Sequence, residues 1–73
     1  MEILAKRIKE EREHCNLTQV QMAELLNIPW DTYRCYESLG KRHANPPLET
    51  LVQIANILKT STDYLLGLSE FGQ

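Results

Sequence analysis

TQVQMAELLNIPWDTYRCYE, residues 18–37, is the stretch of the chain that decides its fold. Thr18 and Gln21 have the spacing of a capping box, in which the hydroxyl satisfies one free backbone N–H at a helix start and the amide satisfies another. The apolar residues that follow recur at helical spacing. The pattern predicts a helix over about residues 18–26. Its inward-facing stripe is predicted to consist of Gln19, Met22, Ala23 and Leu26.

A second short helix is predicted directly after the first. Asn27 tolerates the left-handed conformation that ends a helix, and Pro29 supplies a φ suited to the first turn of a helix over about residues 29–38. At about 100° per residue, the side of that helix expected to face the core carries Tyr33, Tyr36 and Glu37. The side expected to face solvent carries Trp30, Asp31, Arg34, Cys35 and Ser38.

Three further helices are predicted, over about residues 2–14, 48–58 and 61–67. Leu4 and Ile8 lie at helical spacing in the first of them. The segment 39–47 is predicted to be a loop, because it contains a glycine and two prolines. The apolar face of the fourth helix is predicted to consist of Leu48, Leu51, Ile54, Ala55 and Leu58. Residues 1–73 are therefore predicted to form one all-α domain, a compact bundle of five short helices.

The composition is that of a globular chain, with 73 residues, 42% of them apolar and 25% charged. No apolar run approaches the roughly 20 residues that a membrane span needs, and the N-terminus is too charged for a signal peptide. We therefore expect a cytoplasmic protein. Cys15 and Cys35 have no framework spacing, and in that compartment we expect them to be reduced thiols.

The formal net charge of −2 is low for a protein that is held to nucleic acid by bulk positive charge. The distribution of the cations is more informative than their sum. One cluster consists of Lys6, Arg7, Lys9 and Arg12, and a second consists of Arg34, Lys41 and Arg42. Because glutamates alternate with the first cluster, most of it is expected to be a solvated helix face.

The segments LTQVQMAELLNI, YRCYE and PPLETLVQIANILKTSTDYLLG together closely resemble the Cro/phage-repressor type helix-turn-helix family, over about residues 4–68. The resemblance implies a lambda-repressor-like fold in which the second and third helices form the helix-turn-helix. It implies double-stranded DNA as the partner, with the third helix in the major groove. Trp30 and Asp31 depart from the small polar or amide residues common in the family, which affects the target sequence rather than the fold.

The resemblance also assigns roles to individual residues. Gln19 matches a glutamine that contacts the DNA backbone or an outer base. The base-contacting positions of the third helix are occupied here by Trp30, Asp31, Arg34 and Cys35. Family members often pair an arginine of the first helix with the glutamate that closes the third. Here these residues are Arg12 and Glu37, and we expect their pairing to be structural.

The residue types allow several contacts with DNA. Arg34 can donate to a guanine or bind a phosphate, and Asp31 can accept from a cytosine amino group or simply favour the positive end of its helix. Trp30 can pack on a thymine methyl group, lie along a sugar, or pack on a neighbouring loop. Cys35 is expected to be a small neutral contact. The residues expected to contact the DNA backbone are Gln19, Lys41, Arg42 and His43.

These features predict a sequence-specific transcriptional regulator, a repressor that binds an inverted-repeat operator. A monomer of this size contacts few bases, so useful specificity suggests a homodimer across half-sites about 34 Å apart. The dimer contact is expected to involve Ile57, Leu68 and Phe71.

One alternative stays open: a protein-interaction module, such as an antitoxin or adaptor, that uses the Trp30 face on a protein partner. A metal site is not expected, and neither is a cofactor. The candidate metal ligands are His14, Cys15, Cys35 and His43, and apart from adjacent His14 and Cys15 no pair has zinc-site spacing. No nucleophile–base arrangement is visible, so no catalytic residue and no enzymatic activity are expected.

Overall fold

The computed structural model describes residues 1–71, and over this range the chain is all-helical with five helices, as predicted. The helices are α1 (Glu2–His14), α2 (Gln19–Leu26), α3 (Trp30–Glu37), α4 (Leu48–Leu58) and α5 (Thr62–Leu65). No strand occurs among the described residues. A membrane crossing would need a longer and more apolar helix than any found between residues 1 and 71.

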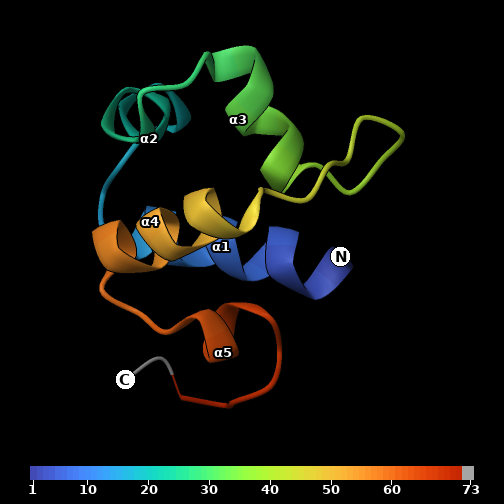
Figure 1. Ribbon diagram of the computed structural model, residues 1–73, viewed down its shortest axis with the longest axis vertical. Helices are drawn as coiled ribbons and strands as arrows, with labels where there is room; N and C mark the ends of the chain where they lie inside the picture. Colours follow the sequence, from blue (N-terminus) through green and yellow to red (C-terminus); the bar gives the residue numbers. More distant parts are fainter. Residues whose placement is uncertain (72–73) are drawn as a thin grey trace.

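The helices are arranged on both sides of a central layer. In Figure 1, α1 and α4 cross the middle of the molecule, α2 and α3 lie above them, and α5 lies below. α1 contacts α3, α4 and α5, and α2 contacts both α3 and α4. The unit formed by α2 and α3 therefore rests on α1 and α4, in a molecule that measures 29 × 24 × 21 Å.

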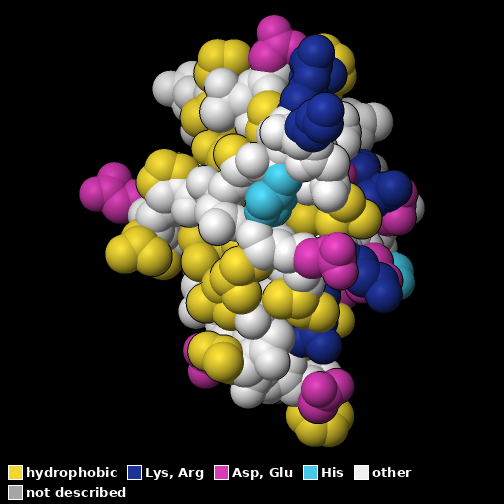
Figure 2. Space-filling view, turned by 90° about the vertical axis from the view of Figure 1, so that its right-hand side faces the viewer, with side chains coloured by type: hydrophobic (Ala, Val, Ile, Leu, Met, Phe, Trp, Pro, Cys, Tyr) yellow, Lys and Arg dark blue, Asp and Glu magenta, His cyan; other side chains and the backbone are white. Residues whose placement is uncertain are grey.

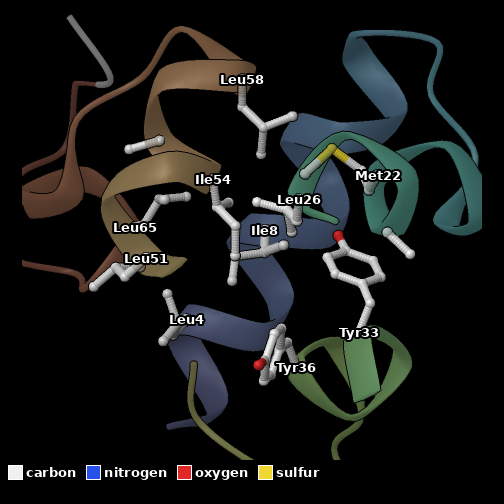
Figure 3. Close-up of a cluster of buried hydrophobic side chains, with 12 residues drawn as sticks. Leu4, Ile8, Met22, Leu26, Tyr33, Tyr36, Leu51, Ile54, Leu58 and Leu65 are labelled. Atoms are coloured by element: carbon white, nitrogen blue, oxygen red, sulfur yellow. The ribbon is translucent and has the colours of Figure 1, made fainter. Parts of the chain in front are cut away.

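All five helices contribute side chains to one hydrophobic core (Figure 3). Its buried members are Leu4, Ile8, Met22, Ala23, Leu26, Tyr33, Tyr36, Leu51, Ile54, Ala55, Leu58 and Leu65. The prediction that Leu48 belongs to the core-facing side of α4 is wrong, because this residue is 80% exposed. Leu48 is the first residue of α4, and side chains on a helix lean toward its N-terminus. Its side chain therefore extends beyond the packed part of the helix.

The turn signals at the start and end of α2 act as the sequence suggested. The Thr18 hydroxyl accepts from the Gln21 backbone N–H at 3.0 Å, and the Gln21 carboxamide oxygen accepts from the Thr18 N–H at 2.8 Å. Asn27 ends the helix in the left-handed conformation, with φ of 57°. The chain therefore turns sharply into α3 instead of continuing the helix.

Five helix ends differ from the predictions by one or two residues: the start of α2 and both ends of α3 and of α5. Pro29 precedes α3 as its N-cap, with ψ of 146°, and is not part of its first turn. α5 ends at Leu65 rather than at 67, because the chain turns back onto α1 through Gly67, whose φ is +83°. Glycine is favoured here because L side chains rarely adopt this φ, and a Cβ atom at Gly67 would also lie close to Cγ1 of Ile3, at 3.2 Å.

Candidate nucleic-acid interface

The outer face of α3, defined by Trp30, Asp31, Arg34 and Cys35, lies at the molecular surface. Trp30 is 45% exposed, Asp31 is exposed, and Arg34 and Cys35 are half-buried. A depression of about 270 Å³ opens on this face, lined by Gln19, Trp30, Arg34, Cys35, Ser38 and Arg42. Residues from α2, α3 and the following loop therefore meet at a single hollow.

The inner face of α3 fixes the direction in which its outer face points. Tyr33 and Tyr36 are buried, and their rings meet edge to face with centroids 6.0 Å apart and an interplanar angle of 82°. In Figure 3 both rings point from α3 toward the core. Because these two large side chains are packed, α3 cannot rotate about its axis without opening the core.

A buried ion pair joins the end of α3 to α1. Arg12 Nε donates to Glu37 Oε2 at 2.7 Å, and Arg12 Nη2 donates to Glu37 Oε1 at 3.0 Å. The Tyr33 hydroxyl also donates to Glu37 Oε2, and Arg12 Nη1 donates to the Leu17 carbonyl at 2.7 Å. Arg12 and Glu37 are only 8% and 7% exposed, so this bidentate pair is shielded from water.

The buried cluster shifts the pKa values of its members. Burial alone raises the pKa of Glu37, but hydrogen bonds from Arg12, Tyr33 and Gln19 outweigh it and hold the pKa below its ordinary value. Burial, followed by the hydrogen bond to Glu37, raises the pKa of Tyr33. The hydrogen bond to Glu37 raises the pKa of Arg12 against the opposing effect of burial. Glu37 and Arg12 are therefore charged at neutral pH, and Tyr33 is a neutral donor.

Gln19 connects this buried cluster to the outer face of α3. Its Nε2 donates to Glu37 Oε1 at 3.1 Å, and its Oε1 accepts from Trp30 Nε1 at 3.1 Å. From the sequence, Gln19 was predicted to lie on the inward-facing stripe of α2. The resemblance to the family assigned it a contact with DNA. Neither the pattern nor the resemblance indicated the bridge, because Glu37 lies 18 residues away and Trp30 lies 11 residues away.

Arg34 lies against two of its neighbours on the outer face. Its guanidinium carbon is 5.0 Å from the centroid of the Trp30 ring, and its Nε is 3.6 Å from Asp31 Oδ1. That Nε atom is shut off from solvent and has no hydrogen-bond partner among residues 1–71. The arginine therefore stacks on the indole, with Asp31 beside it as a counter-charge.

The loop after α3 carries the remaining cations of the predicted site. Lys41 and Arg42 are exposed, and only Arg42 lines the depression. The Ala44 N–H donates to the Cys35 carbonyl at 3.0 Å, and His43 Nδ1 donates to the Ser38 carbonyl at 2.7 Å. These bonds hold the loop against the end of α3.

The cations are not evenly distributed over the face that Figure 2 presents. A group of Lys and Arg side chains lies at the upper end of the molecule, at the height of α3 in Figure 1. Lower on the same face, cations are interspersed with Asp and Glu side chains. On this face the Lys and Arg side chains at the height of α3 are therefore grouped together, with an acidic side chain beside them.

The three residues expected at a dimer contact differ in their exposure. Ile57 is half-buried and packs against the core, whereas Leu68 and Phe71 are 76% and 78% exposed. Arg7 holds the segment that carries these two residues. Its Nη1 donates to the carbonyls of Tyr64 at 2.6 Å and Ser69 at 2.9 Å.

Arg7 also stacks on the Tyr64 ring, with its guanidinium carbon 4.2 Å from the ring centroid. The sequence placed Arg7 in a mainly solvated cluster, so this fixing role was missed. Cys15 and Cys35 are both free thiols. No group of three or more His, Cys, Asp or Glu side chains within residues 1–71 is arranged to hold a metal ion.

Comparison with known proteins agrees with this architecture. A family model described as helix-turn-helix matches residues 8–65. The HTH-type transcriptional regulator ImmR of Bacillus subtilis (strain 168) is 40% identical over 67 residues, which cover 92% of this chain and 50% of that protein. The uncharacterized HTH-type transcriptional regulator YqaE of the same bacterium is 42% identical over 64 residues, covering 88% of this chain and 53% of the relative.

A further relative comes from a phage. The cryptic phage CTXphi transcriptional repressor RstR of Vibrio cholerae is 38% identical over 64 residues, covering 88% of this chain and 54% of the repressor. The chain thus spans about half the length of the curated relatives that it matches. No solved structure matches it significantly. From the family match over most of its length and these relatives, the chain belongs to the helix-turn-helix family of the Cro and phage-repressor type.

Proposed function

We propose that this chain is a sequence-specific DNA-binding transcriptional regulator that acts as a repressor, with α3 in the major groove of double-stranded DNA. The observation that carries the proposal is the outer face of α3. It carries an exposed aromatic residue, an exposed acid and a half-buried arginine on the second helix of a helix-turn-helix, and two exposed cations lie on the following loop. The relatives whose names describe transcriptional regulators and a phage repressor support the same function.

The side chains of this interface divide between bases and backbone. Trp30, Asp31 and Arg34 contact base edges, with Cys35 as a small neutral neighbour. Lys41 and Arg42 contact phosphates, because they lie on the loop that is hydrogen-bonded to the end of α3. With so few cations at the interface, affinity depends on specific contacts, and salt weakens it by displacing the phosphate contacts.

The protein acts as a homodimer on an inverted repeat. Leu68 and Phe71 form the centre of the dimer contact, because large apolar side chains exposed to this degree are typical of interfaces. Ile57 contributes less, since part of its side chain already packs against the core. In such a dimer the two α3 helices enter successive major grooves, about 34 Å apart.

Selection followed by titration tests the function. The folded protein is used to enrich duplexes from a random-sequence library, and an enriched duplex is titrated while the fluorescence of Trp30, the single tryptophan, is followed at two salt concentrations. We expect a saturable change that is absent with a scrambled duplex and weaker at higher salt. We expect Arg42→Ala to reduce the slope of the logarithm of the binding constant against the logarithm of the salt concentration by about one. Lys6→Ala, which removes an exposed cation of α1, is the matched control and is expected to leave it unchanged.

A folded protein that enriches no duplex would contradict the proposal. It would favour the alternative in which the outer face of α3 binds a protein partner. The 45% exposure of Trp30 is the observation that supports this alternative, because tryptophan frequently anchors protein interfaces.

A further inference from the structure

We propose that Gln19, Trp30 and Arg34 form a preassembled recognition unit, in which Trp30 selects the methyl group of a thymine and Arg34 contacts a guanine in the neighbouring base pair. Gln19 acts in this unit as a positioning residue rather than as a DNA contact. The inference rests on the proposed function, because it specifies what the outer face of α3 recognises.

The hydrogen bond from Trp30 to Gln19 restricts what the indole can recognise. Nε1–H is the only hydrogen-bonding group of the tryptophan side chain, and it donates to Gln19 Oε1 at 3.1 Å. The remaining exposed edge of the ring consists of carbon. Trp30 is nevertheless 45% exposed, so part of its side chain is available to a partner. In the major groove, the C5-methyl group of thymine is the apolar group that a base presents.

Gln19 is itself held from behind. Its Nε2 donates to Glu37 Oε1 at 3.1 Å, and Glu37 is fixed in turn by the buried pair with Arg12. The carboxamide is therefore oriented with its oxygen toward Trp30. A swap of its oxygen and nitrogen would direct an N–H₂ group at the indole N–H and an oxygen at a carboxylate, which is unfavourable at both ends. The core thus sets the orientation of the indole through one side chain.

Arg34 is placed to recognise a base next to the thymine. Its guanidinium carbon lies 5.0 Å from the Trp30 ring centroid, so the two side chains lie side by side on the outer face of α3 and reach adjacent parts of the groove. Its Nε is shut off from solvent beside Asp31, so Nη1 and Nη2 are the groups left to donate. Two such donors match the O6 and N7 acceptors of guanine. Because stacking already restricts the side chain, little freedom is lost on binding.

Replacement of thymine by uracil tests the methyl contact. In a duplex enriched from a random-sequence library, each thymine is replaced in turn by deoxyuridine, which removes only the methyl group. We expect one position in each half-site, next to a required guanine, where the replacement weakens binding about fourfold, as for one buried methyl-sized group. Trp30→Ala is expected to weaken binding to both duplexes and to remove the difference between them.

The same pair of duplexes separates positioning by Gln19 from direct contact. We expect Gln19→Ala to reduce the thymine-to-uracil affinity ratio toward one and to lower the fluorescence anisotropy of Trp30 in the free protein. Gln53→Ala, which changes an exposed glutamine of α4, is the matched control and is expected to alter neither quantity. Equal loss of affinity for both duplexes in Gln19→Ala, with the ratio kept, would overturn the positioning role.

The inference and the proposed function fail in different ways. Sequence-specific binding that is insensitive to uracil at every thymine would overturn the recognition unit and leave the function standing. A folded protein that enriches no duplex would overturn both.

Discussion

At the scale of single residues, Glu37 is the point where three helices meet. Its carboxylate accepts hydrogen bonds from Arg12 of α1, Gln19 of α2 and Tyr33 of α3. A buried carboxylate is tolerated only when its oxygens are satisfied in this way. The position of α3 relative to α1 and α2 therefore depends on a polar cluster as well as on the hydrophobic core.

Loss of Arg12 is expected to be severe. Arg12→Ala removes both donors of the bidentate pair and leaves the charge of Glu37 buried without its counter-charge, so we expect the free energy of unfolding to fall by roughly 3 to 5 kcal/mol. Thermal and urea unfolding measure the change. Lys9→Ala removes an exposed cation from the same helix and is expected to change stability little. An unchanged melting temperature for Arg12→Ala would show that the pair contributes nothing.

The shifted pKa values make stability depend on pH at both extremes. Because the pKa of Glu37 is lowered in the folded state, its contribution is complete above the ordinary glutamate pKa of about 4.3 and is lost as the pH falls through the lowered value. Because the pKa of Tyr33 is raised, its contribution is complete below about pH 10 and is lost at more alkaline pH.

Urea unfolding between pH 2 and pH 7 tests the acid limb. Glu37→Gln is expected to flatten this dependence, whereas Glu13→Gln, at an exposed position of α1, is expected to keep it. Wild-type stability that stays constant across this range would contradict the role assigned to Glu37.

Residues with local signals or a family pattern could be placed from the sequence, and the others could not. Helical periodicity gave the burial of Tyr33 and Tyr36, and the resemblance gave the pairing of Arg12 with Glu37. Nothing in the spacing of α1 separates Arg7, whose partners lie 57 and 62 residues away, from the solvated cations beside it. The bridge made by Gln19 was hidden for the same reason: its partners come together only in the folded chain.

At the scale of the elements, the two helices of the α2–turn–α3 unit differ in how far local sequence signals determine their ends. These signals are stronger for α2 than for α3. α2 has a complete capping box and a left-handed Asn27, so its start and end are both fixed by short-range contacts. α3 has no side-chain cap, because Pro29 occupies its N-cap position. The packing of α3 against α1 and α2 therefore matters more for its stability than its own sequence signals do.

Removal of the capping box is expected to weaken α2. Thr18→Ala loses the hydroxyl acceptor and should lower the free energy of unfolding by about 1 kcal/mol. Gln21→Ala loses only the reciprocal bond to the Thr18 N–H, so we expect a smaller effect from it. Urea unfolding of both variants makes the comparison, and a neutral Thr18→Ala would contradict the contribution assigned to the cap.

At the scale of the whole molecule, two sets of polar side-chain contacts hold the helices around one core. The Arg12–Glu37 cluster joins α1 to the α2–α3 unit, and Arg7 joins α1 to the segment after α5. Periodicity could predict five helices and their apolar faces, since these follow from sequence spacing. It could not predict that Leu48 lies beyond the core or that α5 is short, because both depend on how the helix ends meet their neighbours.

Arg7 is expected to control the order of the C-terminal segment. Arg7→Ala removes the donors to the Tyr64 and Ser69 carbonyls, so the segment that presents Leu68 and Phe71 should loosen. We expect faster hydrogen exchange at the amides of Gly67 and Leu68 and weaker assembly of two copies on an inverted repeat. Lys6→Ala is the control. Unchanged exchange at both amides would contradict the anchoring role of Arg7.

The most direct test of the central claim, that the outer face of α3 contacts bases in the major groove, is methylation interference on an enriched duplex. Dimethyl sulfate methylates guanine at N7, in the major groove, and adenine at N3, in the minor groove. We expect methylation of specific guanines to block binding of the wild-type protein, and Arg34→Ala to lose that sensitivity at one guanine in each half-site. Specific binding that is blocked only by methylated adenines would place the contact in the minor groove and contradict the claim.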